Sequence, residues 1–174
     1  MSNLIRVLVG IQHACLWLAS LVLGLLPLIT FYDVMMRYLF HAPTIWASEV
    51  SLYLLQFLVF FTLGALVLDG SHVRVTFWIE GQTGPRRAWA EAVTTALILP
   101  YAGILVWYGG LYASNAFNRG MLSPTLLEIP LWLPYGLIPA GGLLLALGAL
   151  TKIMMIARDP AAYMGLAHGQ GEAA

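Results

Sequence analysis

The sequence predicts an all-α membrane protein with four transmembrane helices. Of the 174 residues, 60% are hydrophobic and only 9% are charged, and the mean hydropathy is +0.83. Soluble domains usually carry about 25% charged residues, so an ordinary globular core is excluded. Charged residues also bracket four long uncharged segments. Each segment is about as long as the roughly 20 residues that a helix needs to cross a bilayer.

The first predicted span covers residues 7–32. Arg6 precedes it as a basic residue precedes a signal peptide, but the apolar run exceeds the about 7–15 residues of a signal core. We therefore predict that this helix is retained. The following segment, Asp33 to Ser48, mixes polar and aromatic side chains. It fits an interfacial amphipathic segment between the first two helices or, equally, a plain loop.

The second predicted span, residues 50–68, holds thirteen Leu, Val or Phe residues against four polar ones. Insertion of those thirteen gains at most about 4 to 8 kcal/mol, which outweighs the mild polar residues. The third and fourth spans are predicted at 92–114 and 131–151. All four belong to one domain, residues 1–163, and the small-residue tail 164–174 is predicted to be disordered. Four prolines are expected to kink or end helices: Pro27, Pro100, Pro134 and Pro139.

The distribution of basic residues predicts that both termini lie in the cytoplasm. Lysine and arginine concentrate on the cytoplasmic side of a membrane protein. The N-terminus, the loop after the second span and the C-terminus carry six of these residues, and the other side carries two. The six are Arg6, Arg74, Arg86, Arg87, Lys152 and Arg158, and the two are Arg37 and Arg119.

Several function classes are disfavoured by what the spans contain. The net charge is +0, so no basic excess is present to bind nucleic acid. Ionisable residues at depth usually mark catalysis or ion coupling, and the acidic residues here only bracket the spans. We therefore expect no enzyme, no metal site and no cofactor. The single cysteine, Cys15, makes neither an internal disulfide nor a CxxC site.

Small residues within the spans are the candidates for close helix packing. In lipid, helices associate where small side chains let the backbones approach. Most of the candidates are paired at four-residue spacing, which is common in membrane chains and therefore indicates packing within the bundle more than a partner surface. They are Ser20, Gly24, Gly64, Gly109, Ala113, Gly136, Ala140, Gly142 and Ala146.

Several short motifs in a fixed order point to a known family. They are Arg37-Tyr38-Leu39-Phe40, Trp46-Ala47-Ser48-Glu49, Gly64-Ala65, Asp69-Gly70-Ser71-His72-Val73-Arg74-Val75, and Glu128-Ile129-Pro130-Leu131-Trp132-Leu133-Pro134-Tyr135-Gly136 followed by Ile138-Pro139-Ala140-Gly141. With these motifs the chain resembles the small membrane subunit of tripartite ATP-independent periplasmic (TRAP) transporters, the DctQ-like small permease family. It departs at Ser48 and Thr76, where the family often has acidic residues.

The resemblance implies a scaffold subunit in the bacterial inner membrane. A large multispan membrane subunit would carry the substrate and ion sites, and an extracytoplasmic solute-binding protein would deliver an organic acid or related solute for ion-gradient-driven uptake. Six residues are hypothetical anchors to the lipid interface or to the large subunit. Arg37, Trp46, Glu49 and Trp132 are expected at the outer interface, and His72 and Arg74 at the inner one.

Two other functions remain open from the sequence. A standalone channel or small exporter would form a polar pore by homo-oligomerisation. A haem-binding membrane redox subunit would need paired histidines on facing helices, and only His13 lies within a predicted span.

Overall fold

The computed structural model describes residues 3–68, 85–125 and 127–158. This part of the chain forms helices and short connections, and it contains no strand beyond one isolated bridge between Leu122 and Pro130. The helices are α1 (Asn3–Tyr38), α2 (Ala47–Leu68), α4 (Pro85–Ala96), α5 (Ile98–Asn118) and α6 (Trp132–Arg158). Four helical stretches are long and apolar enough to cross a membrane. The predicted all-α fold with four spanning helices is confirmed.

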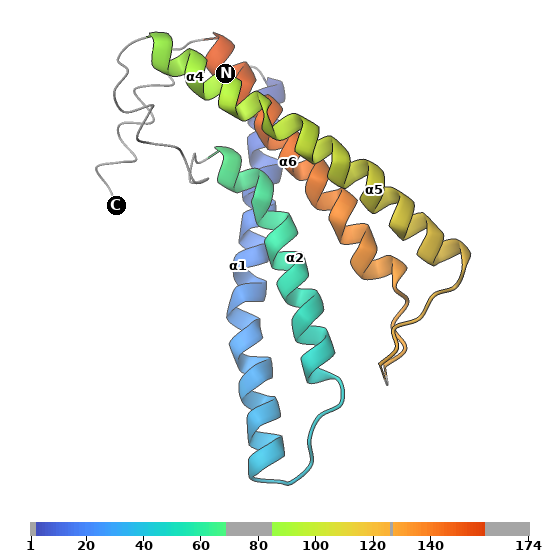
Figure 1. Cartoon of the computed structure of the whole chain (residues 1–174). Coiled ribbons are helices and arrows are strands. Elements are labelled where there is room, and N and C mark those ends of the chain that lie inside the picture. Colours follow the sequence, from blue (N-terminus) through green and yellow to red (C-terminus); the bar gives the residue numbers. More distant parts are fainter. Residues whose placement is uncertain (1–2, 69–84, 126, 159–174) are drawn as a thin grey trace.

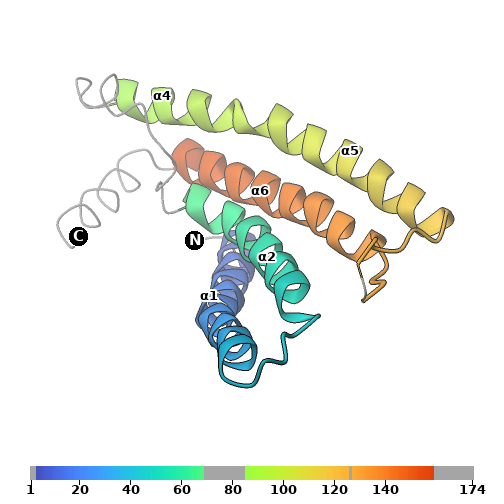
Figure 2. The same ribbon diagram turned by 60° about the horizontal axis from the view of Figure 1, so that its bottom comes forward.

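The helices are arranged in the order α1, α2, α6, α5, with each packed on the next (Figures 1 and 2). Residues 39–46 join α1 to α2 and residues 119–131 join α5 to α6, so each of these pairs is antiparallel. The two hairpins meet near the start of α1 and diverge toward their connections (Figure 1). Nearly half of the most apolar stretch of α6 is buried, against less than a fifth in the other spans. The helix α6 is therefore the centre of the assembly.

Residues expected to form an interfacial segment between the first two helices are divided between a helix and a connection. The helix α1 continues to Tyr38, beyond the predicted end at residue 32, and the described residues 39–46 form no separate amphipathic helix. In the last turn of α1, Nη2 of Arg37 donates a hydrogen bond to Oδ2 of Asp33 at 2.8 Å. The hydroxyl of Thr44 donates to the same carboxylate and ties the connection back onto α1.

The third spanning stretch is interrupted at Leu97, between α4 and α5. Pro100 has no N–H to donate to the carbonyl of Ala96, one turn back, so the helical hydrogen bonding is broken there. Leu97 itself keeps right-handed helical angles, with φ −65° and ψ −16°, so the chain continues almost in line. By contrast, Pro27 and Pro139 lie inside α1 and α6.

The apolar core is small and lies where α2, α5 and α6 meet. Its buried members are Val67, Ala102, Leu145 and Ala149, and Leu63, Ile98, Leu99, Leu105 and Ala146 pack against it. Most large apolar side chains elsewhere are exposed along the helices. A soluble protein rarely presents so much contiguous apolar surface, whereas lipid tails solvate it, which agrees with the membrane-spanning lengths of the helices.

Candidate functional site: a helix crossing and a loop clasp

Helices α1, α2 and α6 meet at a contact that we call the glycine crossing, made by Gln12, Gly64, Gly148 and the carbonyl of Leu144. A Cβ atom placed on Gly148 would lie only 2.5 Å from the carbonyl oxygen of Gly64. A Cβ on Gly64 would lie 2.5 Å from the carbonyl oxygen of Leu144. Real Cβ contacts are longer than 3.0 Å. Backbones of α2 and α6 therefore touch here only because both positions are glycine.

Gln12 brings α1 into the same crossing. Its side chain is 2% exposed, and its Nε2 donates to the carbonyl oxygen of Leu144 on α6 at 2.9 Å. The amide also covers Gly64, since a Cβ there would lie 2.2 Å from Gln12 Oε1. This one polar side chain of α1 therefore contacts both α2 and α6.

The other predicted packing residues are placed unequally. Gly109 and Gly142 lie in the α5–α6 contact, where added Cβ atoms would meet Pro139 Cδ at 2.8 Å and Leu105 Cβ at 3.0 Å. Ala146 packs against the core, and Ala113 and Ala140 are half-buried. By contrast, a Cβ on Gly24 or Gly136 would meet nothing within 4 Å, and the exposed Ser20 bonds to the Leu16 carbonyl of its own helix.

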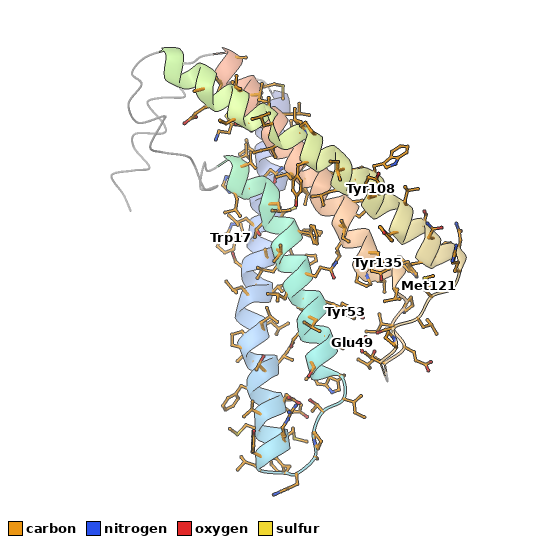
Figure 3. The ribbon with its side chains drawn as sticks, viewed as in Figure 1. Trp17, Glu49, Tyr53, Tyr108, Met121 and Tyr135 are labelled. Atoms are coloured by element: carbon orange, nitrogen blue, oxygen red, sulfur yellow. The ribbon has the colours of Figure 1, made fainter. Side chains whose placement is uncertain are left out.

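Four side chains, two at the start of α2 and two in the α5–α6 connection, form what we call the loop clasp: Glu49, Tyr53, Ser123 and Thr125. The Tyr53 hydroxyl donates to Glu49 Oε1 at 2.8 Å, one turn along α2. The Thr125 hydroxyl donates to the other carboxylate oxygen, and the Ser123 and Thr125 hydroxyls lie 2.9 Å apart. Figure 3 shows Glu49 and Tyr53 on the side of α2 that faces α6. The clasp therefore attaches the α5–α6 connection to the start of α2.

The backbone of the α5–α6 connection is itself ordered by hydrogen bonds. The Ser123 N–H donates to the Ile129 carbonyl at 2.9 Å, and the Leu131 N–H donates to the Met121 carbonyl at 2.9 Å. Gly120, at φ +57°, and Glu128, at φ +46°, supply the left-handed residues that reverse the chain. About two turns along α2 from Glu49, Gln56 Nε2 donates to the Pro134 carbonyl at 2.7 Å and forms a second hydrogen-bonded contact between α2 and α6.

The predicted anchoring residues are only partly brought together. Glu49, 7% exposed, lies in the loop clasp, and Trp132 packs edge-on against Phe117 with ring centroids 5.9 Å apart. Arg37 pairs with Asp33, and Trp46 stacks on Tyr32 at 6.1 Å, so these two belong to the α1–α2 connection instead. His72 and Arg74 lie outside the described residues, as does the tail 164–174.

Sequence reasoning did not single out Tyr53, Thr125, Gly148 or Gln12 as contact residues. The four-residue spacing of Glu49 and Tyr53 was a usable signal, because such residues share a helix face. Gly141 and Gly148, seven residues apart on α6, were another: a Cβ on Gly141 would lie 2.5 Å from Phe60 Cδ1 on α2. Nothing in the sequence pairs Thr125 with Glu49, because they are 76 residues apart.

The Gln12 Nε2 of the crossing and the polar side chains of the clasp bond to other parts of the same chain. Within the described ranges, no three His, Cys, Asp or Glu residues lie close enough together to hold a metal ion. The exposed and buried hydroxyls of the spans mostly bond within their own helices, as Thr62 and Thr151 do with Leu58 and Leu147. The arrangement is suited to holding helices in fixed positions.

Comparison with known families gives one match. The model of the DctQ component of tripartite ATP-independent periplasmic transporters matches residues 26–159, which is well over half of the chain and includes both the loop clasp and the two glycines of the crossing. A search of curated proteins found no match.

Proposed function

We propose that this chain, which belongs to the DctQ component family of tripartite ATP-independent periplasmic transporters, is the fixed scaffold of such a transporter. The family is a transporter component and not an enzyme family. Its multi-pass helical fold suits a subunit that remains in the membrane and supports other components.

In this proposal the chain does not handle the solute. A large multispan membrane subunit carries the substrate and ion sites, and an extracytoplasmic binding protein delivers an organic acid or related solute. Uptake is driven by an ion gradient. Alternating access requires one part of a transporter to move against another, and the small subunit supplies the part that stays still.

The glycine crossing is the observation that carries the proposal. At Gly64 and Gly148 the backbones of α2 and α6 are in direct contact, and Gln12 joins α1 to both. Sliding of α2 along α6 would drive side chains of neighbouring residues into a contact that admits none. Packed interfaces of this kind shift between discrete arrangements rather than deforming continuously. The central helix is thus suited to remain rigid while a partner moves.

The position of the chain in the cell is part of the same proposal. The chain lies in the bacterial cytoplasmic membrane, with both termini in the cytoplasm, as the six basic residues on that side favour. The loop clasp then faces the extracytoplasmic side. Arg37, Trp46 and Trp132 anchor that side in the interface, and His72 and Arg74 act at the inner interface.

Co-purification from the native host tests the proposal. The tagged chain is extracted in mild detergent, and the proteins that accompany it are identified by mass spectrometry. A stoichiometric large multispan partner is expected. Recovery of the chain alone, as a stable homo-oligomer, would contradict the scaffold role and favour a standalone channel or exporter.

A further inference from the structure

Helix α5 exposes tyrosine side chains at a depth where membrane proteins seldom leave a hydroxyl. Tyr101 and Tyr108 are each 57% exposed, and Tyr112 is 63% exposed. Their spacings of seven and four residues place them along one side of the helix. Figure 3 shows Tyr108 on α5, at the opposite edge of the helix row from Trp17 on α1.

Two of these tyrosines lie well inside the spanning stretch Ala90–Asn118. At 1.5 Å per residue, Tyr101 lies roughly 5 Å and Tyr108 roughly 6 Å from its midpoint, on opposite sides. When the middle of this stretch lies at the middle of a hydrocarbon core about 30 Å thick, both side chains start near the centre of the core. A hydroxyl transferred there without a hydrogen bond costs several kcal/mol on alkane scales.

The described part of the chain does not satisfy these two hydroxyls. Serine and threonine in the spans donate to a carbonyl of their own helix, as Thr30 does to Leu26 at 3.0 Å and Ser114 to Leu111 at 3.0 Å. The aromatic ring of a tyrosine holds its hydroxyl too far out for such a bond. Among the described residues, none is a hydrogen-bond partner of the Tyr101 or Tyr108 hydroxyl.

The exposed side of α1 provides the contrast. Its middle carries Leu21, Leu25 and Leu28, all exposed and all without a polar atom in the side chain. Lipid tails solvate these three leucine side chains completely. They cannot accept a hydrogen bond from a phenol, so the surface of α5 calls for a partner that presents polar atoms at membrane depth.

We infer that the Tyr101–Tyr108 side of α5 is the surface on which the large transporter subunit packs, with backbone carbonyls or polar side chains of its membrane helices accepting both phenol hydrogen bonds. This inference rests on the proposed function, because a tripartite transporter supplies the membrane partner. Hydrogen bonds between membrane helices are individually modest. Together with ring packing over α5 they select this surface over the leucine surface of α1.

Site-specific photo-crosslinking in the native host tests the inference. The photoreactive amino acid p-benzoylphenylalanine replaces Tyr108 in one tagged variant and Leu21 in a matched control, since both sites are exposed near the middle of a span. After irradiation, a crosslink from position 108 to the large multispan subunit is expected, with at most a tenth of that yield from position 21.

Each alternative outcome contradicts the inference. When the unsubstituted chain co-purifies with the large subunit, crosslinks from position 108 to lipid only, or to a second copy of the chain, overturn the surface but leave the scaffold role standing. An equal or stronger crosslink to the large subunit from position 21 does the same. When the unsubstituted chain has no such partner, the scaffold role and the inference fail together.

A double substitution tests the hydroxyls separately from the surface. Y101F/Y108F keeps the rings and removes only the two donors, so folding is preserved at these exposed sites. We expect about fivefold to tenfold less large subunit recovered per tagged chain, from two interhelical hydrogen bonds of ordinary strength. Tyr38→Phe, at an exposed site in the last turn of α1, is the control and should leave recovery unchanged. Equal recovery for the double variant and the control would contradict the hydrogen-bonded contact.

Discussion

The glycine crossing and the loop clasp both attach α2 to the α5–α6 hairpin, but by different physical means. At the crossing, α2 and α6 touch through backbone atoms at Gly64 and Gly148, and one buried amide adds a single hydrogen bond. At the clasp, a carboxylate on α2 accepts hydroxyl hydrogen bonds from its own helix and from the loop. Close backbone packing therefore stabilises the crossing, and side-chain hydrogen bonds stabilise the clasp.

The difference follows from the surroundings of each end. Within lipid, apolar burial does not drive helix association, so close packing at small residues supplies the contact. At the helix connections, the backbone of the loop needs hydrogen bonds that helices provide internally, and the residues Ser123 and Thr125 provide ties to Glu49. Substitutions at the crossing should therefore change the stability of the whole fold, whereas substitutions at the clasp should change the order of the loop.

The largest effect is expected from Gly148→Ala. The added methyl group must lie 2.5 Å from the Gly64 carbonyl oxygen, and a backbone atom cannot rotate away as a side chain can. We expect a loss of about 2–3 kcal/mol in the free energy of unfolding, measured in mixed micelles. Gly24→Ala is the control, because nothing lies within 4 Å of its Cβ. It should be neutral or stabilise by up to about 1 kcal/mol through helix propensity. Equal stabilities for the two variants would mean that α2 and α6 are not in contact at the crossing.

A smaller and local effect is expected from Glu49→Gln. The neutral amide offers only one acceptor oxygen where the carboxylate accepts from both Tyr53 and Thr125. The α5–α6 connection should become several-fold more susceptible to protease within residues 119–131, while the thermal midpoint changes little. Glu128→Gln, in the same loop but exposed, should not alter cleavage. Unchanged cleavage in Glu49→Gln would show that the clasp does not order the loop.

The smallest effect is expected from Gln12→Leu, although Gln12 is almost fully buried. Leucine retains much of the side-chain volume, and the Gln12 Oε1 has no hydrogen-bond partner among the described residues. Replacing such a group by an apolar one costs little, so the change in unfolding free energy should stay within about 1 kcal/mol. A loss as large as that of Gly148→Ala, measured in the same micelles, would make the hydrogen bond to Leu144 the main contact.

The number of spanning helices and their positions along the chain could be predicted from the sequence, because the lengths of the uncharged segments determine them. The exact residues at which the helices begin and end were predicted less well. Helix α1 continues six residues past residue 32, since Asp33 and Arg37 pair within the helix instead of ending it. The interruption at Leu97 follows from Pro100. The sequence predicted that this proline would kink or end a helix, but not the exact residue at which the interruption lies.

The contacts could be predicted only in part. Gly64 and Gly24 are equivalent in the sequence, as small residues within apolar helices, yet only Gly64 lies against another helix. Helices α1, α2, α5 and α6 carry apolar residues around most of their circumference, so hydropathy does not tell which side of them faces inward. The clasp depends on a loop that returns Thr125 to Glu49, and no local pattern encodes a contact over that separation.

Covalent locking of α2 to α6 tests the scaffold role most directly. In a chain with Cys15 replaced by serine, cysteines at Val67 and Ala149, both in the buried cluster between these helices, are joined by oxidation or a short thiol linker. Solute uptake by the assembled transporter is compared before and after locking. A fixed scaffold predicts unchanged uptake in the locked form. Loss of uptake that returns on reduction would show that α2 and α6 move during transport and would contradict the account.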